Sequence, residues 1–596
     1  MRRANALTAV IVGLLAFVLL AATGHHLGLT YDEPIYMSKS LLAYQWLVDL
    51  LSGREATSEA AVRRYWDATR DQQPGSIKLL FGTVTGLLGG VLPVPVLTAG
   101  RLGTMLLAAV LVGVLYWLVT DLWGNAAGVV AAGGLLLMPR VWTHMHLAAL
   151  DAPIMALSFF TVVLVFLAAR HDSPWLCVAA GVVFGLALGT KLNSFFIPLI
   201  VLPWLLCLRK WRLAAWTAGA MVVVGLLTLW ATWPWLWHDT WARAAEYFEF
   251  HLHHYHVATT YFGTTWELAP WHYAVVMTAI TTPPIILVLG ALGLYAAALG
   301  WKPMMSHRRA ARPSMPSPPT PLPRGEGCPQ GGVRGRTKQT GATTDNAAYW
   351  QGACLILLGW GLVVNIAPSM LPWAPKYGGV RLFLPMFPYV AAISGVGFYW
   401  LSSVIIERGR DSWGAGLANF PAKLRATLVV LVIFALVVAV GNCHPFGMSY
   451  YNSLIGGPSG AYRLGMEPTY WGDTYLAAVA WLNREAEDGA KVWINVVGFA
   501  SSVELYKPFG MLREDLRITA GDAALTQADY VVVQHKQNEM TPLMHHLAAA
   551  GRPLFAEQLD GVALVWVFAG DDPACWGARH APAAVGGIAS GGQYDD

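Results

Sequence analysis

A succession of apolar runs dominates this chain, and most are close to the roughly 20 residues that an α-helix needs to cross a bilayer. Hydrophobic residues make up 56% of the sequence and charged residues only 12%, whereas soluble domains carry about 25% charged residues. The sequence therefore predicts a polytopic α-helical membrane protein with about eleven transmembrane helices. The runs lie near 6–22, 102–120, 126–138, 152–169, 176–188, 195–206, 214–231, 273–299, 352–366, 382–401 and 427–440.

Charge placement suggests how these runs are oriented. The first run follows Arg2 and Arg3 and has no convincing cleavage site, so we expect a retained helix with a cytoplasmic N-terminus. A further apolar piece, Leu79–Leu97, contains glycines and prolines and either crosses the membrane or lies in its interface. If it lies in the interface, the basic loops near Arg209, Arg308 and Arg408 all face the cytoplasm. Residues 24–98 then form a first outer loop with interfacial helices.

Two stretches depart from the membrane pattern. Residues 301–349 are rich in Pro, Gly, Ser and Arg, and we expect a disordered cytoplasmic loop there. After a transmembrane domain at 1–442, the composition changes to that of a small α/β domain at 443–596, on the outer face in this topology. Its expected strands lie at 491–497, 529–533 and 562–567, and its expected helices at 475–485 and 541–549. Cys443 and Cys575 either pair there or remain two thiols.

Adjacent carboxylates stand a few residues after the first apolar run, in Thr30-Tyr31-Asp32-Glu33-Pro34. Proline restricts the residue before it, so the pair marks a helix start. One interpretation is that Asp32 and Glu33 cap the helix that begins near Pro34. The other is that the carboxylates, placed beside the bilayer, act on a lipid headgroup.

Other polar residues stand at the ends of apolar runs. Arg101 either binds an anion or anchors its helix by snorkelling, and Lys191 and Arg381 allow the same two interpretations. Asp151 precedes Pro153, so its alternatives are an N-cap and a site role. The histidine-rich run 249–256 could present two metal ligands on one helix, but its spacing matches no recognised zinc signature. Its neighbouring tryptophans favour an interfacial aromatic belt.

In combination, these residues resemble the GT-C membrane glycosyltransferases, in particular glycosyltransferase family 39, the protein O-mannosyltransferase and aminoarabinose-transferase group. Two departures are Gln73, where the family has histidine, and His146, where it has arginine. The matching stretches are Asp32-Glu33, Gln73-Pro74-Gly75-Ser76-Ile77-Lys78, Ala99-Gly100-Arg101-Leu102, His146-Leu147-Ala148-Ala149-Leu150-Asp151, Thr190-Lys191-Leu192-Asn193 and Gly379-Val380-Arg381-Leu382-Phe383-Leu384-Pro385.

The resemblance implies an inverting transfer of a sugar from a polyprenyl-phosphate carrier to an acceptor hydroxyl. In its terms Asp32 is the base, and Glu33 and Asp151 complete the catalytic set. The donor phosphate would be met by Arg101, Lys78, Lys191 and Arg381, while Tyr31 and His146 line the site. The acceptor could be a protein, a lipid or a glycan. No cofactor is required, with a divalent metal as the alternative, and the net charge of +4 is too small to suggest nucleic acid.

Two other classes of protein remain to be separated from the enzyme. A secondary transporter would place charges near the bilayer midplane and show two similar halves, whereas the acidic residues here cluster at span ends. A non-catalytic membrane scaffold would not need its acidic and basic groups to come together. On the enzyme interpretation, the protein lies in the inner (plasma) membrane of a bacterium, with an extracytoplasmic site and C-terminal domain.

Overall fold

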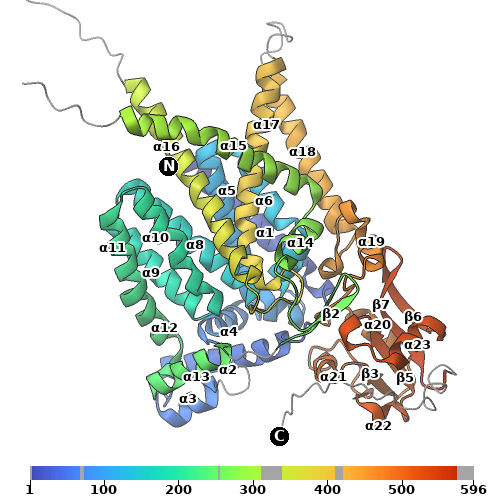
Figure 1. Ribbon diagram of the computed structural model, residues 1–596. Coiled ribbons are helices and arrows are strands. Elements are labelled where there is room, and N and C mark those ends of the chain that lie inside the picture. Colours follow the sequence, from blue (N-terminus) through green and yellow to red (C-terminus); the bar gives the residue numbers. More distant parts are fainter. Residues whose placement is uncertain (1–2, 68–72, 253–255, 311–338, 410–419, 573–596) are drawn as a thin grey trace, which may run out of the picture. The chain divides into compact units, whose positions relative to one another are not determined.

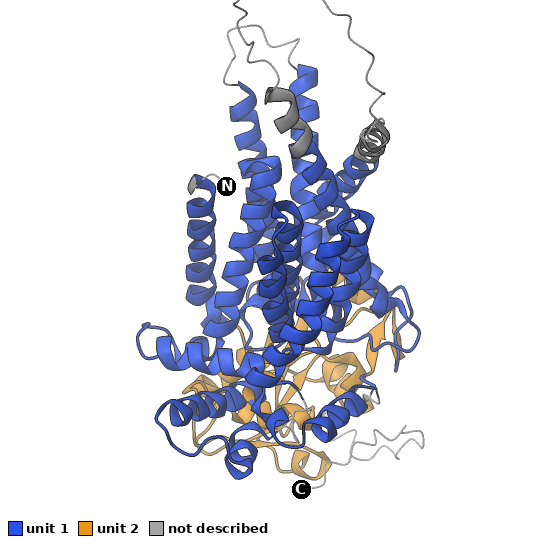
Figure 2. Cartoon of the chain, turned by 90° about the vertical axis from the view of Figure 1, so that its left-hand side faces the viewer, with its two compact units in different colours: residues 1–26, 35–257, 267–455 blue, residues 27–34, 258–266, 456–596 orange. Residues whose placement is uncertain are grey.

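A computed structural model describes residues 3–67, 73–252, 256–310, 339–409 and 420–572. The chain divides into two compact units (Figure 2). The first comprises 1–26, 35–257 and 267–455, and the second comprises 27–34, 258–266 and 456–596. The C-terminal part of the second unit begins at Gly456, after the expected boundary at 443, and two short segments from the first half of the chain group with it.

The first unit is helical (Figure 1). Its longer elements are α1 (Arg3–Thr23), α2 (Glu33–Leu51), α3 (Glu59–Trp66), α4 (Ser76–Leu88), α5 (Val96–Trp123), α6 (Asn125–Leu136), α7 (Pro139–His146), α8 (Asp151–His171), α9 (Pro174–Leu188), α10 (Ile197–Cys207), α11 (Trp211–Ala220), α12 (Leu226–Thr232), α13 (Thr240–Leu252), α14 (Tyr273–Thr281), α15 (Pro284–Ala310), α16 (Gln339–Ile366), α17 (Phe387–Gly409) and α18 (Phe420–Gly441). Short helices join them, including η1 (Gly24–His26), η2 (Leu192–Phe196), the π-helical η3 (Met221–Gly225), η4 (Pro234–Trp237), η5 (Ala367–Met370) and η6 (Arg381–Met386).

Seven helices of the described chain are long and apolar enough to cross a membrane, or up to nine if each of two bent pairs is one span. The expected eleven spans require that two shorter apolar helices, at Pro174–Leu188 and Leu192–Cys207, cross as well. Each of these helices coincides with one expected run. The integral membrane class is confirmed.

Proline breaks two of the expected spans. The run at 273–299 is not one straight helix, because α14 and α15 meet at 117° around Pro283 and Pro284. The run at 126–138 is followed by a 69° bend into α7, whose first residue is Pro139. In both cases proline removes a backbone donor and disfavours helix at the residue before it.

The expected disordered loop at 301–349 is helical at both ends. Helix α15 continues to Ala310 and α16 begins at Gln339, while 311–338 lie outside the described residues.

Small residues allow α1 and α5 to pack closely. A methyl group on Gly113 of α5 would lie 2.8 Å from the Ala9 carbonyl oxygen of α1, so the two backbones approach closely, as small residues permit in membranes.

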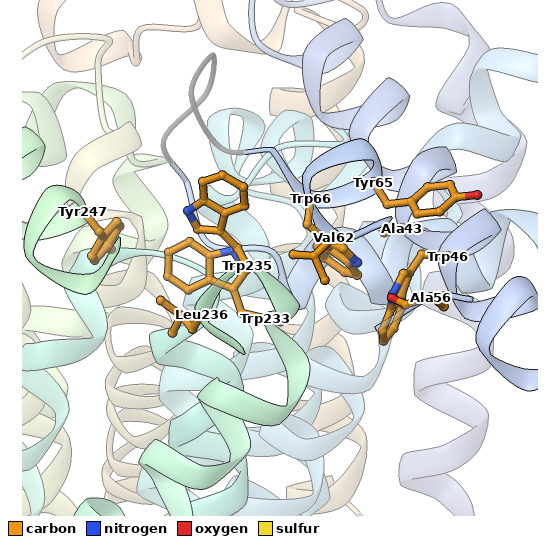
Figure 3. Close-up of a cluster of buried hydrophobic side chains, with 10 residues drawn as sticks. All are labelled: Ala43, Trp46, Ala56, Val62, Tyr65, Trp66, Trp233, Trp235, Leu236 and Tyr247. Carbon is orange, nitrogen blue, oxygen red and sulfur yellow. The ribbon is translucent and has the colours of Figure 1, made fainter. Parts of the chain in front are cut away.

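An aromatic cluster ties together the helices that follow the membrane-crossing elements (Figure 3). Its members come from α2, α3, η4, α13, the loop before α3 and the position between α12 and η4: Ala43, Trp46, Ala56, Val62, Tyr65, Trp66, Trp233, Trp235, Leu236 and Tyr247. Arg243 lies over the Trp235 ring at 3.9 Å and donates to the Trp235 carbonyl oxygen at 2.6 Å. The residues expected as interfacial aromatic anchors are therefore largely packed against one another.

The second unit is an α/β domain around a five-stranded sheet of order β4-β3-β5-β7-β6. Strands β3 and β4 and strands β3 and β5 are parallel, whereas β7 is antiparallel to β5 and to β6. The elements are β1 (Thr259–Tyr261), β2 (Thr264–Trp266), α19 (Gly457–Arg463), α20 (Tyr475–Glu485), β3 (Lys491–Ile494), α21 (Val497–Glu504), β4 (Arg517–Thr519), α22 (Asp522–Leu525), β5 (Tyr530–Gln534), α23 (Pro542–Ala550), β6 (Phe555–Leu559) and β7 (Val562–Ala569). All three expected strands and both expected helices are present.

Candidate functional site

Asp151 binds two cations that come from distant parts of the sequence. It is the first residue of α8, and its side chain does not cap the helix. One carboxylate oxygen, Oδ1, accepts from the Lys191 ammonium, and the other, Oδ2, accepts from Arg381 Nε at 2.9 Å. The three side chains therefore form one ion cluster. The Asp151 carboxylate binds these two cations and does not cap the helix.

Local structure explains how the two cations reach the carboxylate. Lys191 is extended, in the loop where α9 has ended and η2 begins, and its carbonyl oxygen accepts from Ser194 Oγ at 2.9 Å. Arg381 opens η6 two residues after Gly379, and Gly378 and Gly379 both have positive φ. Asn193 Nδ2 donates to the Leu382 carbonyl oxygen at 2.8 Å. The two cation-bearing loops are thus also joined by a hydrogen bond from a side chain of one to the backbone of the other.

The exposure of the ion cluster is uneven. The Asp151 side chain is only 1% exposed, whereas those of Lys191 and Arg381 are 15% and 16% exposed. With two cations and one carboxylate, the cluster has a formal charge of +1. A buried carboxylate that holds two partly accessible cations is an arrangement that can bind an anionic ligand.

Helix α7 lies between this ion cluster and a second buried cation. His144 is within electrostatic range of Asp151, Lys191 and Arg381. His146, two residues later, is within range of Arg101. His146, which was expected to line the site, is fully buried between Trp142 and Thr23. Its Nδ1 donates to the Trp142 carbonyl oxygen, and its Nε2 lies 2.8 Å from Thr23 Oγ1.

Arg101 lies inside the first unit, where no side-chain surface is exposed. Its Nη1 donates to the Gly24 carbonyl oxygen at 2.8 Å, which ties α5 to the short helix that ends α1. A snorkelling anchor would keep its charged head in water. The burial of Arg101 therefore excludes the anchor interpretation and leaves a structural or binding role.

Two histidines meet beside Gly24. His26 Nδ1 lies 3.0 Å from His444 Nε2, so one ring donates to the other. Burial lowers the pKa of His444, and the neighbouring His26 and His25 lower it further. The sequence did not predict this contact between His26 and His444, because 418 positions separate the two residues.

Lys78, the remaining candidate cation, is buried near the start of α4. Its Nζ donates to the Gln73 carbonyl oxygen at 3.1 Å and lies 5.9 Å from the centre of the Tyr36 ring. The lysine thus meets the backbone of Gln73.

The structure places the acidic pair in the second unit. Glu33 is fully buried, and its Oε2 accepts from the Thr30 backbone N–H at 2.9 Å. This is half of a capping box, in which a carboxylate reaches back to the backbone at the helix start. Asp32 and Tyr31 are partly exposed. Of the two carboxylates, therefore, Glu33 has the capping role and Asp32 has the more accessible side chain.

The structure thus brings three of the predicted site residues into direct contact: Asp151, Lys191 and Arg381. Arg101, His146 and Lys78 belong to the same unit, while Tyr31, Asp32 and Glu33 belong to the other. The contact between Thr30 and Glu33 was not predicted, although the Thr-x-x-Glu spacing is a recognised helix-start signature. Sequence analysis also missed Arg140, which is buried and donates to the Tyr450 carbonyl oxygen at 3.1 Å.

The remaining expectations concern metal and cysteine. His251 Nδ1 donates to the Tyr247 carbonyl oxygen, while His253 and His254 lie outside the described residues. Across the part of the chain that the structure describes, no group of three His, Cys, Asp or Glu side chains could hold a metal ion. Cys443 has a thiol that donates to the Ala439 carbonyl oxygen, and Cys575 lies outside the described residues.

Comparison with solved structures finds overall similarity at low sequence identity. ArnT from Cupriavidus metallidurans bound to undecaprenyl phosphate is 14% identical, with 96% of this chain and 98% of that chain covered and a TM-score of 0.43. The archaeal oligosaccharyltransferase AglB from Archaeoglobus fulgidus, in complex with an inhibitory peptide and a dolichol-phosphate, is 11% identical. The match covers 89% of this chain and 69% of that chain, with a TM-score of 0.42. Comparison with curated protein sequences finds no match.

A family model gives the most direct evidence from sequence. Residues 80–238 match the family described as dolichyl-phosphate-mannose-protein mannosyltransferase. This range contains four of the predicted site residues: Arg101, His146, Asp151 and Lys191. The expected resemblance to membrane glycosyltransferases that use lipid-phosphate donors is therefore confirmed over this part of the chain.

Proposed function

We propose that this protein is an inverting, GT-C-like glycosyltransferase that moves a sugar from a polyprenyl-phosphate carrier to an acceptor hydroxyl. In the reaction, the bond between the anomeric carbon and the phosphate oxygen breaks, and a bond from the acceptor oxygen to the anomeric carbon forms. The acceptor proton passes to a base, and the lipid phosphate leaves with the electron pair. Such a step needs one carboxylate near the hydroxyl and cations near the phosphate.

The observation that carries the proposal is the ion cluster of Asp151, Lys191 and Arg381. Its net charge is positive, its two cations are partly exposed, and its carboxylate is not. We assign Lys191 and Arg381 to the leaving phosphate, because charge-assisted hydrogen bonds from arginine and lysine stabilise a developing phosphate charge. Asp151 then acts by holding both cations in position, rather than on the sugar itself.

Arg101 and Lys78 are proposed as further phosphate-binding groups of the first unit. Arg101 lies within the matched family range and carries a charge at a fully buried position. Arg101 Nη1 donates to the Gly24 carbonyl oxygen and Lys78 Nζ donates to the Gln73 carbonyl oxygen, so backbone contacts help to position both cations.

Asp32 is proposed as the base. A carboxylate is ionised at neutral pH, and one within hydrogen-bond reach of a hydroxyl can accept its proton. Asp32 is partly exposed, whereas Glu33 is buried and bound to the helix start, so the neighbouring carboxylate is assigned a positioning role. Tyr31 and His146 are assigned to the site lining.

The proposal also covers compartment and partners. We infer that the protein lies in a bacterial inner membrane with its site and C-terminal domain outside the cytoplasm, since only that orientation places the basic loops inside. The partners are then a polyprenyl-phosphate sugar, membrane lipids, and an acceptor that is a protein, a lipid or a glycan. The alternatives are a secondary transporter and a non-catalytic membrane scaffold.

Reconstituted protein offers the direct test. Wild-type protein in vesicles should convert labelled polyprenyl-phosphate sugars to a transferred product, and the label should identify the acceptor. Asp32→Asn should abolish transfer at unchanged expression and unchanged donor binding. Full activity in Asp32→Asn would refute the assignment of the base. Vesicles that move labelled donor or sugar without forming product would instead favour a transporter.

A further inference from the structure

The loop that precedes Asp32 is buried, and this imposes a requirement on its backbone. Leu27, Leu29 and Thr30 are at most 2% exposed, although they form no regular secondary structure. A buried loop must find partners for its backbone N–H groups, because an unsatisfied buried donor costs as much as a lost hydrogen bond. The partners of this loop therefore determine where Asp32 stands.

Three successive backbone N–H groups have their partners within the second unit. The Leu29 N–H donates to the Tyr506 hydroxyl at 2.5 Å, and the Tyr31 N–H donates to the Trp471 carbonyl oxygen at 3.0 Å. Between them, the Thr30 N–H donates to Glu33. Two of the three partners thus come from the α/β domain, more than 400 positions later in the chain.

Side-chain packing fixes the same segment. The Tyr31 ring meets the Phe499 ring edge to face, with centroids 5.4 Å apart. At Gly28 the chain passes so close to the domain that an added methyl group would lie 1.9 Å from the Asp473 carbonyl oxygen and 2.9 Å from the Tyr506 hydroxyl. Only glycine allows this approach. Tyr506 is 1% exposed, so its hydroxyl cannot turn to water instead.

We propose that Tyr506 and Gly28 are positioning residues for Asp32, so that the C-terminal domain holds the base of the transfer reaction in place. This rests on the proposed function, because it takes Asp32 as the base. The domain is then part of the catalytic machinery rather than an appended module. Neither residue touches substrate in this proposal; both act through the backbone of the loop.

The test compares two tyrosines of the same domain in the full-length protein. Tyr506→Phe removes the acceptor of the Leu29 N–H and keeps the ring. Tyr475→Phe is the matched control, since its hydroxyl donates to Asn495 Oδ1 at 2.8 Å and is equally buried, but it does not bind the loop. We expect kcat to fall about tenfold or more in Tyr506→Phe at unchanged donor KM, because small displacements of a catalytic group cost one to two orders of magnitude. The control should keep wild-type kcat.

Hydrogen exchange gives a readout that does not depend on activity. The peptide covering 27–33 should exchange faster in Tyr506→Phe than in wild type or Tyr475→Phe. Unchanged exchange would overturn the inference, and so would faster exchange with an unchanged kcat. If wild-type protein transfers no sugar, the proposed function fails, while the exchange comparison still reports whether the domain holds the loop.

A second pair of variants covers the case in which Tyr506→Phe does not fold. Gly28→Ala disturbs the loop from its own side, and Gly90→Ala is the control, because a methyl group there meets nothing within 4 Å. The proposal expects loss of kcat and faster exchange at 27–33 in Gly28→Ala only. Equal behaviour of the two alanine variants would overturn it.

Discussion

Asp151 and Arg381, 230 positions apart in the sequence, are joined by an ion pair of 2.9 Å between carboxylate Oδ2 and guanidinium Nε. Because Lys191 binds the other oxygen of the same carboxylate, one buried acid organises two cations from two loops. The acid is almost completely buried and the cations are not. This difference separates the group that holds the cluster together from the groups that can meet a ligand.

Asp151→Asn should weaken donor use and stability together. Asparagine keeps the shape but leaves two cations facing each other without a counter-charge, and breaking a buried ion pair by removing one partner costs about 3 kcal/mol. We expect a lower Tm and a kcat/KM for the lipid-phosphate donor reduced at least tenfold. Donor titrations and thermal unfolding in detergent measure the two effects.

Asp121→Asn is the matched control for this variant. Asp121 forms an ion pair of 2.6 Å with Arg170 between α5 and α8, and both side chains are only partly exposed. Its loss should lower Tm and leave donor KM unchanged. If both variants lost donor affinity equally, the effect of Asp151→Asn would be one of general stability, and the binding role of the cluster would be lost.

The two carboxylates of the acidic pair should respond differently to substitution. Glu33→Ala removes the acceptor of the Thr30 N–H and should lower stability by about 1 kcal/mol, as expected for a lost helix cap. Asp32→Ala should abolish transfer because it removes the proposed base, and it should lower Tm less than Glu33→Ala does, because Asp32 is partly exposed whereas Glu33 is buried. Thermal unfolding and initial rates of both variants decide the assignment; equal loss of activity without a stability difference would contradict it.

Much of the fold could be predicted because it depends on local pattern. Apolar runs of span length predicted the membrane helices, and strands such as Tyr530–Gln534 and Val562–Ala569 are short stretches rich in valine and aromatic residues. Strand β4, at Arg517–Thr519, has only three residues and no apolar alternation, so nothing in its sequence marked it. The two prolines at 283 and 284 could have predicted the bend, but the length of the apolar run favoured one continuous helix.

The site was only partly predictable, because its contacts are long-range. Asp151, Lys191 and Arg381 were each predicted separately, because each stands at the end of an apolar run. Nothing in the sequence shows that Asp151 pairs with the other two, because they lie in loops 40 and 230 positions away. The hydrogen bond from the Leu29 N–H to the Tyr506 hydroxyl could not be predicted either, because no sequence signature links a tyrosine in a soluble domain to a distant backbone partner.

Arg101→Lys should impair donor binding although it keeps the charge. The guanidinium reaches the Gly24 carbonyl oxygen through Nη1 and has further donors in a planar fork, which an ammonium on a flexible stem does not reproduce. We expect donor KM to rise about tenfold, the loss of one charge-assisted hydrogen bond. Arg425→Lys, at an arginine whose Nη2 donates to Ser403, is the control. An unchanged KM in Arg101→Lys would count against a phosphate role.

The stability of the α/β domain should fall as the pH drops from about 6.5 to about 4. His535 is buried against the Trp566 and Tyr462 rings, and its Nδ1 donates to the Ala563 carbonyl oxygen at 2.8 Å. Burial lowers the pKa of His535 from 6.5 to about 4. The unfolded chain therefore binds a proton in this range that the folded domain does not.

The sign and size of this effect follow from the two pKa values. Above pH 6.5 the histidine is neutral in both states and favours neither. Down to about pH 4 the folded domain loses up to about 3 kcal/mol relative to the unfolded chain. Domain unfolding, followed by tryptophan fluorescence or by exchange of β5 and β7 amides in the full-length protein, should show this fall, and His535→Gln should flatten it. A His535→Gln variant with the wild-type slope would assign the pH dependence to another group.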